Sequence, residues 1–164
     1  GFKTVLAKGV SGCVRLDDRV LGAMADYIGL APAHNPPYIA GIRLFAQRMP
    51  DVPRVGLFET AFYQFAPEAN MRYAVPQAWH DIGVRRYGFH GLSYEYIASV
   101  LPQHDARAAA GRTVVLHLGN GASMCALKAR TSVATSMGFT ASNSLASAIA
   151  SSNALVLIRC RIRS

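Results

Sequence analysis

The spacing of apolar residues along the chain predicts at least three helices. Between residues 19 and 30, apolar side chains recur every three or four positions, as on one buried helix face, and Asp17 precedes them as a candidate N-cap. A second helix is expected after Asn35, which can cap it because two prolines suited to a first turn follow. The third is expected over residues 92–101, with Tyr94, Ile97 and Ala98 facing inward, and Ser93 can help to cap it.

Short apolar runs predict strands between these helices. Residues 55–58, 85–89 and 112–118 each have the length and composition of a strand, and residues 124–128 can return beside the last of these. The segment 141–158 lacks charged residues and is rich in Ala and Ser, so that both a helix and a low-complexity tail fit it. Helices alternating with short strands indicate a mixed α/β fold.

The strand at residues 112–118 runs directly into a glycine-rich turn, since residues 113–123 read TVVLHLGNGAS. Glycine lets a ligand approach the backbone closely, and successive backbone N–H groups in such a turn can form a concave anion site. A plain β-hairpin whose Asn120–Gly121 pair makes a tight turn fits the same residues. The segment alone leaves both interpretations open.

The net charge of the chain indicates which class of partner it favours. The 164 residues include 17 Lys and Arg against 9 Asp and Glu, a formal net charge of +8, which favours anionic partners. The basic residues are scattered, apart from Arg85–Arg86 and a cluster within residues 159–163, and no Lys/Arg stripe is interleaved with aromatic residues. A dedicated nucleic-acid-binding module is therefore not expected.

The cysteines and the chain ends indicate the compartment. Cys13, Cys125 and Cys160 form no CxxC pair, so neither a disulfide framework nor a cysteine metal site is expected. The first residues lack the order of a secretory leader, and the apolar tract at residues 145–158 is too short and too polar to span a membrane. We therefore expect a cytoplasmic chain that does not bind membranes.

Four side chains stand out as candidate chemistry. His34, His90 and His117 lie next to glycines or an Asn–Pro pair, which are typical of turns and helix starts. At such positions an imidazole can donate to a phosphoryl oxygen. Glu59 ends a predicted strand, and ligands gather at that end of strands in open α/β sheets. Taken singly, each histidine is more often structural, and the glutamate is more often an ordinary surface acid.

Five segments in a fixed order add a family resemblance. They are AHNPP (33–37), GLFETAFYQ (56–64), RRYGFHGLSYEYI (85–97), HLGNGASMCALK (117–128) and TSMGFT (135–140). This set resembles the acetate kinase family, the acyl-phosphate-forming kinases of the actin-like ATPase superfamily. The resemblance extends over about residues 14–140, which is well under half of a typical family member.

The resemblance implies a fold and a division into lobes. The fold would consist of partial actin-like ATPase (ribonuclease H-like) lobes, with a mixed sheet and flanking helices. Residues 1–58 would belong to the first lobe, residues 59–140 would begin the second and carry the phosphate loop, and residues 141–164 would form an atypical Ala/Ser-rich and Arg-rich tail. The abrupt loss of similarity and of charged residues at Ala141 leads to the hypothesis that this tail is out-of-frame sequence.

The resemblance also implies a reaction, the reversible transfer of phosphate from ATP to acetate or a similar short carboxylate such as propionate. The cofactors would be ATP and Mg²⁺, with metal ligands outside this chain, and a homodimer is possible. Phosphoryl transfer depends mainly on positioning and charge stabilisation, which imidazole and backbone N–H donors can supply. The implied residues are the catalytic Glu59, His90 and His34, the phosphate-loop residues His117, Leu118, Gly119, Asn120 and Gly121, and the carboxylate-pocket residues Phe89 and Ala33.

Two departures from the family pattern reduce the expected activity. The family has aspartate where this chain has Glu59, and misplacing a reacting group by about 1 Å can lower a rate on the order of 10²-fold. The family's catalytic arginine beyond the TSMGFT segment has no counterpart, and such an arginine can contribute about 10³–10⁵ in rate. We therefore expect a weak or inactive kinase fragment, or alternatively a non-catalytic nucleotide- or phosphate-binding remnant.

Overall fold

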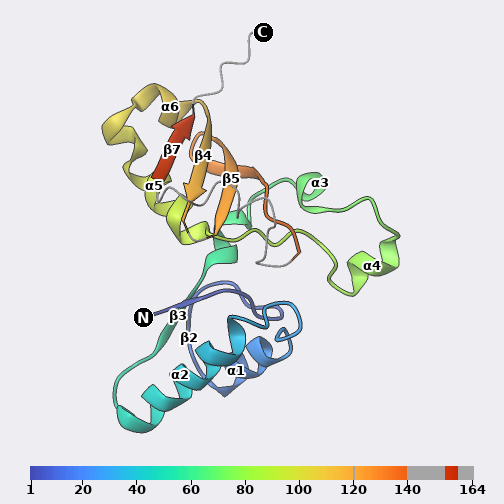
Figure 1. Ribbon diagram of the computed structural model, residues 1–164, viewed down its shortest axis with the longest axis vertical. Helices are drawn as coiled ribbons and strands as arrows, with labels where there is room; N and C mark the ends of the chain where they lie inside the picture. Colours follow the sequence, from blue (N-terminus) through green and yellow to red (C-terminus); the bar gives the residue numbers. More distant parts are fainter. Residues whose placement is uncertain (120, 140–153, 159–164) are drawn as a thin grey trace. The chain divides into compact units, whose positions relative to one another are not determined.

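The computed structural model describes residues 1–119, 121–139 and 154–158, the last of these by backbone only. The chain divides into two compact units, Gly1–Ala61 and Phe62–Ser164, and each is described here by itself (Figure 1). Both units combine strands with helices, which confirms the expected mixed α/β architecture.

The first unit contains a three-stranded mixed sheet. Strand β3 (Val55–Phe58) lies in the middle, parallel to β1 (Phe2–Thr4) and antiparallel to β2 (Gly12–Arg15). Helices α1 (Asp18–Ala25) and α2 (Asn35–Arg48) belong to the same unit. The predicted N-cap of α1 is confirmed, because the Asp17 side chain accepts a hydrogen bond from the Val20 N–H at 2.9 Å.

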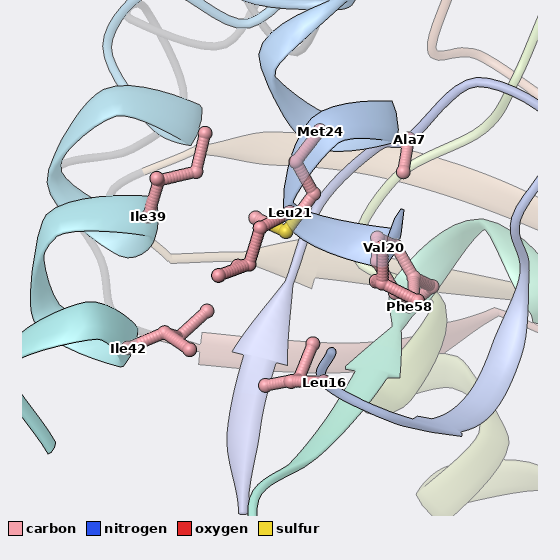
Figure 2. Packing of buried hydrophobic residues seen from close by; sticks show 8 residues of the cluster. All are labelled: Ala7, Leu16, Val20, Leu21, Met24, Ile39, Ile42 and Phe58. Atoms are coloured by element: carbon pink, nitrogen blue, oxygen red, sulfur yellow. The ribbon is translucent and has the colours of Figure 1, made fainter. Parts of the chain in front are cut away.

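Apolar side chains from both helices and the sheet form the core of this unit (Figure 2). The members shown are Ala7, Leu16, Val20, Leu21, Met24, Ile39, Ile42 and Phe58. Three of them lie on α1 at the helical spacing that the sequence pattern predicted.

The prediction that Asn35 caps α2 is wrong. Its side chain is fully buried, and its amide donates to the carbonyls of Leu6 at 2.9 Å and Met24 at 2.8 Å. His34 occupies the N-cap position and makes no side-chain capping bond. The Asn35 side chain therefore links the start of α2 to two other segments. Its amide supplies the hydrogen-bond donor that a buried carbonyl needs.

The second unit contains a four-stranded antiparallel sheet in the order β6-β5-β4-β7. The predicted hairpin is confirmed, since β4 (Arg112–Leu118) pairs with β5 (Ala122–Lys128). Strand β6 (Thr131–Thr135) continues the sheet beside β5. Part of the Ala- and Ser-rich segment forms β7 (Ala154–Ile158) beside β4, neither helix nor tail, while the rest of residues 141–164 lies outside the described residues.

Helix α5 (Gly91–His104) is the long helix of the second unit, and α6 (Ala106–Ala110) follows it. Tyr94, Ile97 and Ala98 of α5 are buried as predicted, and they share a core cluster with residues of β4 and β5. None of the helices in the described residues is long and apolar enough to cross a bilayer.

Shorter helical turns precede α5, namely η1 (Glu59–Tyr63), α3 (Glu68–Met71) and α4 (Gln77–Asp81). The strand predicted at residues 85–89 is wrong, because this segment pairs with no strand and Gly88 within it has φ of +75°. Its N–H groups bond singly instead, Arg86 to a carbonyl of α3 and Tyr87 to the carbonyl of Gly138.

Candidate functional site

Two of the singled-out histidines meet in the second unit. His90 occupies the N-cap position of α5 with left-handed backbone angles (φ 59°, ψ 19°), and His117 lies near the end of β4. Their rings stack with centroids 4.2 Å apart and planes inclined by 22°. Helix α5 and the β4–β5 hairpin thus bring together two imidazoles that are far apart in the sequence.

A serine hydroxyl lies against the Nδ1 atom of each histidine. The distance from His90 Nδ1 to Ser123 Oγ is 2.7 Å, and that from His117 Nδ1 to Ser93 Oγ is 2.9 Å. The prediction that Ser93 caps α5 is wrong, because α5 has no side-chain capping bond. Both serines instead orient a ring, which leaves each Nε2 atom on the opposite edge.

The hydroxyl of Tyr94 extends the contact at His90. It lies 2.5 Å from Ser123 Oγ, the Tyr94 side chain is fully buried, and its ring meets that of His117 edge-on with centroids 6.4 Å apart. Burial raises the pKa of this phenol well above its ordinary value, and the nearby hydrogen bonds offset only part of the rise. Tyr94 therefore keeps its proton at physiological pH.

The glycine-rich turn lies against the Nε2 edges of the two rings. A Cβ atom added to Gly119 would lie 2.9 Å from His117 Nε2, and one added to Gly121 would lie 2.9 Å from His90 Nε2. The Gly119 N–H donates to the Gly121 carbonyl at 3.2 Å and closes the turn, while Asn120 lies outside the described residues. A larger residue at either glycine would collide with an imidazole, so the close packing of the turn against the two rings requires glycine at both positions.

The segment before His90 is fixed by Tyr63. The Tyr63 hydroxyl donates to the Phe89 carbonyl at 2.5 Å, and its ring packs where a Cβ atom of Gly88 would lie. Gly88 has φ of +75°, a conformation that glycine adopts without strain. The Phe89 side chain is buried, and Leu118 at the end of β4 is half-buried.

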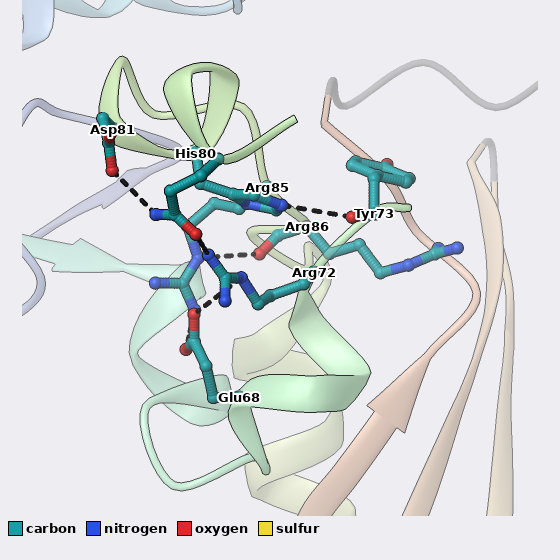
Figure 3. Close-up of polar contacts among 8 residues, drawn as sticks. Glu68, Arg72, Tyr73, His80, Asp81, Arg85 and Arg86 are labelled. Atoms are coloured by element: carbon teal, nitrogen blue, oxygen red, sulfur yellow. Dashed lines mark hydrogen bonds and ion pairs between the residues drawn. The ribbon is translucent and has the colours of Figure 1, made fainter. Parts of the chain in front are cut away.

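The basic cluster of the second unit is a separate feature (Figure 3). Glu68 pairs with Arg72 at 3.8 Å and with Arg85 at 3.4 Å, and the Arg86 guanidinium lies 4.8 Å from the centre of the Tyr73 ring. These contacts pair the arginines of residues 72–86 with Glu68 and Tyr73 of the same unit. Exposed ion pairs of this kind contribute little to stability. Because these arginines already have partners within the unit, we do not assign the cluster to the candidate site.

Glu59 lies in the first unit and is buried, with 3% of its surface exposed. The sequence alone favoured a surface acid, and the structure corrects that expectation. The Lys3 ammonium lies 3.2 Å from a Glu59 carboxylate oxygen, because β1 runs parallel to β3 and pairs Lys3 with Leu57. A buried carboxylate needs such a partner, but the strand pairing that supplies it has no local sequence signal.

His34 and Ala33 also lie in the first unit, just before α2. His34 is half-buried with its ring 6.3 Å from the ring of Tyr38, and Ala33 is exposed. The structure therefore gathers His90, His117 and the two turn glycines within one unit, while Glu59, His34 and Ala33 belong to the other. Among the described residues, no cluster of three His, Cys, Asp or Glu side chains could hold a metal ion.

Comparisons with known proteins place these features in a family. The sequence model of the Acetokinase family matches residues 7–153, a longer stretch than the motifs indicated. The acetate kinase of Methylocella silvestris is 51% identical over 135 residues, which make up 82% of this chain and 33% of that protein. The acetate kinase of Rhizobium meliloti is 51% identical over 124 residues, 76% of this chain and 32% of that protein.

Solved structures agree with the sequence relatives. A propionate kinase from Francisella tularensis superposes with a TM-score of 0.77 at 35% identity, covering 85% of this chain and 36% of that one. The acetate kinase of Porphyromonas gingivalis gives 0.74 at 34% identity, with 85% and 36% covered. These likenesses confirm the expected actin-like α/β fold, and the chain spans about a third of the length of the relatives it matches.

Proposed function

The chain belongs to the acetokinase family, and from that premise we propose that it is part of a phosphotransferase that moves phosphate reversibly between ATP and a short carboxylate such as acetate or propionate. The observation that carries the proposal is the stacked pair His90 and His117, whose Nε2 edges lie against the Gly119–Gly121 turn. ATP would supply the phosphoryl group when bound, and Mg²⁺ would neutralise part of its charge.

In this proposal the phosphate groups lie in the turn, held by backbone N–H groups and by the two imidazoles. The 14-residue helix α5 begins beside His90, so the positive end of its dipole also favours an anion there. The proposed phosphate loop consists of His117, Leu118, Gly119, Asn120 and Gly121.

The family resemblance supports further roles that complete the proposal. His90 and His34 would stabilise charge on the transferring group, and Glu59 would act as the catalytic acid after release from Lys3. Phe89 and Ala33 would line the carboxylate pocket. Glu59 would begin the second lobe at residues 59–140, a boundary close to the division between the two compact units.

We also propose a cytoplasmic location and a homodimer, as the family resemblance implies. Free thiols at Cys13 and Cys125 among the described residues are typical of a reducing compartment and support the location. Light scattering on the purified chain would measure its mass and test the dimer.

A second candidate is a non-catalytic nucleotide- or phosphate-binding unit. It is favoured by the location of the proposed phosphate site, which lies within the second unit alone, in a chain that spans a third of its relatives. The two candidates share ATP binding and differ in turnover.

Two measurements on the chain separate them. Calorimetric titration with ATP is expected to give binding at roughly millimolar concentration, and His90→Ala and Gly119→Val are expected to abolish it. His104→Ala is the matched control, because His104 is exposed at the far end of the same helix.

Acetyl phosphate formation from ATP, Mg²⁺ and acetate is expected to be far slower than the roughly 1–100 s⁻¹ of ordinary kinases. Slow turnover that His90→Ala removes supports the kinase, and binding without turnover supports the second candidate. An absence of binding at millimolar ATP would contradict both.

A further inference from the structure

The segment that leads into His90 has an unusual backbone. Gly88 has φ of +75° and His90 has φ of 59°, so two of three consecutive residues lie in the left-handed region. Glycine adopts this region without strain, whereas for a histidine it costs free energy. Such a conformation persists only where the surrounding structure enforces it, and it is found often at functional sites.

The segment does not take its shape from a sheet, because it pairs with no strand. Single backbone hydrogen bonds from the N–H groups of Arg86 and Tyr87 hold its beginning. Closer to His90, the Phe89 carbonyl accepts a hydrogen bond of 2.5 Å from the buried Tyr63 hydroxyl. The direction of this bond is settled by its partners, since a carbonyl oxygen can only accept and the phenol carries the proton.

Tyr63 also contacts the residue before Phe89. Its ring packs where a Cβ atom of Gly88 would lie, and Tyr63 is only 3% exposed. Tyr63 belongs to the same core cluster as Tyr94 and Ile97 of α5, so the core of the second unit holds its ring in place. One anchored side chain thus contacts Gly88 with its ring and Phe89 with its hydroxyl.

These contacts act on His90 through the peptide bond that it shares with Phe89. This bond is planar, so a fixed Phe89 carbonyl also fixes the direction of the His90 N–H. On the other side, the His90 carbonyl accepts from the N–H groups of Ser93 and Tyr94 in the first turn of α5. With both neighbouring peptide groups held, the His90 backbone has little freedom to rotate. The His90 ring stacks on that of His117 from this backbone position, with centroids 4.2 Å apart.

We propose that Tyr63 is a positioning residue of the candidate phosphate site, which holds Gly88 and Phe89 so that His90 keeps its left-handed backbone and its ring stays stacked on His117. The role in phosphate binding rests on the proposed function, whereas the effect on the His90 backbone does not. Without the Tyr63 hydroxyl, the Phe89 carbonyl loses its buried donor and the peptide is free to turn. His90 then relaxes toward the right-handed region, and its ring leaves the stack.

Tyr87 offers a matched comparison within the same unit. Its hydroxyl donates to the Gly83 carbonyl at 2.7 Å, which is the same kind of bond as that from Tyr63 to Phe89. The Gly83 carbonyl lies seven residues before His90 and shares no peptide bond with it. Removal of the Tyr87 hydroxyl is therefore expected to leave the His90 backbone unchanged.

NMR of the ¹³C,¹⁵N-labelled chain without ligand tests this difference. The coupling between the His90 N–H and Hα protons, with the Cα shift, reports the left-handed backbone, and Overhauser contacts between the His90 and His117 rings report the stack. Tyr63→Phe removes one oxygen atom and keeps the ring. We expect it to move the His90 coupling and Cα shift toward right-handed values and to weaken the ring contacts, while Tyr87→Phe changes neither.

This readout is local, because a general loss of stability leaves the coupling of the folded molecules as it was. An unchanged His90 backbone and stack in Tyr63→Phe would overturn the proposal, and so would equal changes in Tyr87→Phe. Backbone amide dispersion shows whether a variant has folded. If Tyr63→Phe has not, Gly88→Ala decides the question, because its Cβ atom would displace the Tyr63 ring. A folded Gly88→Ala chain with unchanged His90 signals would then contradict the role of Tyr63.

Titration with inorganic phosphate separates the positioning role from the proposed function. Displacement of one imidazole donor is expected to weaken phosphate binding roughly two- to tenfold in Tyr63→Phe, with no change in Tyr87→Phe. If the unmodified chain does not bind phosphate but Tyr63→Phe still displaces His90, the effect on the backbone stands and the proposed function fails. Unchanged phosphate affinity in a variant with a displaced His90 would refute the link between Tyr63 and the phosphate site.

Discussion

The two units differ in how they hold the residues that the sequence singled out. In the second unit, His90 and His117 are each bonded at Nδ1 by a serine, and a glycine lies against each Nε2 edge. In the first unit, the charge of Glu59 is neutralised by Lys3. The difference shows that the two histidines and two glycines of the proposed phosphate site are held within one unit, by helix α5 and the β4–β5 hairpin.

The largest expected effect tests whether the units are independent. Asn35→Ala removes the buried amide donor of the Leu6 carbonyl, and an unsatisfied buried carbonyl costs about 1–3 kcal/mol. It also removes a bond of about 1 kcal/mol to the Met24 carbonyl, which keeps its bond from the Tyr27 N–H at 3.2 Å. We expect urea denaturation to show a loss of about 2–4 kcal/mol in the unfolding of the first unit, with unchanged NMR signals of His90 and His117.

Gln47→Ala is the control, because Gln47 is exposed on the same helix α2. Movement of the two histidine signals in Asn35→Ala, but not in Gln47→Ala, would show that the second unit needs the first to form its site.

The next expected effect concerns how the stability of the second unit depends on pH. Burial raises the pKa of the Cys125 thiol to about 11 from an ordinary value of 9.0. Its contribution to stability is complete below pH 9 and is lost as the pH rises toward and through 11, because the unfolded chain releases the proton first. Two pKa units correspond to about 2–3 kcal/mol. Between pH 9 and 11, the free energy of unfolding of Cys125→Ala is expected to fall by about 2–3 kcal/mol less than that of the unmodified chain.

Thermal unfolding at a series of pH values measures this difference, and Cys13→Ala is the control because Cys13 is exposed. Tyr94 contributes a loss of the same sign only above its ordinary pKa of 10.0, and the Cys125 charge adds to the rise in its pKa. The effect of Cys125 itself is therefore read between pH 9 and 10. Identical pH profiles for Cys125→Ala and Cys13→Ala would contradict the assignment.

A smaller effect tests the turn itself. Gly121→Val places a side chain against His90 Nε2, and we expect phosphate and ATP affinity to fall at least about tenfold, or 1.4 kcal/mol. Gly41→Ala is the matched control, because a Cβ atom there meets open space on α2. Equal affinities of the two variants in calorimetric titration would mean that the anion binds elsewhere.

The smallest expected effect concerns the ion pair of Glu59 and Lys3 in the first unit. Glu59→Gln removes the charge that pairs with Lys3, and since Lys3 is half-exposed the loss of stability is expected to be about 1 kcal/mol or less. Phosphate affinity in the second unit is expected to remain within about twofold of the original. A loss of affinity as large as that of Gly121→Val would contradict the separation of the two regions.

Local patterns predicted the parts of the fold that local interactions determine. The Asp17 cap, the buried face of α5 and the β4–β5 hairpin follow from spacing and capping chemistry within a few residues. The short strands β1, β2 and β6 were not predicted, because three to five residues give too little periodicity and their pairing is set by neighbours in the sheet.

The sequence motifs proposed residues for the candidate site, and their roles stay predictions, but the motifs did not show the contacts between these residues. The motifs supplied His90, His117 and the turn glycines, whereas the contacts of Ser93 and Ser123 depend on how α5 lies against the hairpin. The burial of Glu59 likewise depends on a strand pairing that brings Lys3 beside it. Contacts between distant segments carry no local signal, so periodicity could not show them.

The most direct test of the phosphate site follows the histidine rings of the chain by ¹H–¹⁵N NMR during titration with ATP. The account predicts that the ring signals of His90 and His117 move together and saturate at roughly millimolar ATP, while those of the internal controls His80 and His104 stay in place. Unmoved signals of His90 and His117, or equal shifts at all four rings, would contradict a phosphate site between these histidines and the glycine turn.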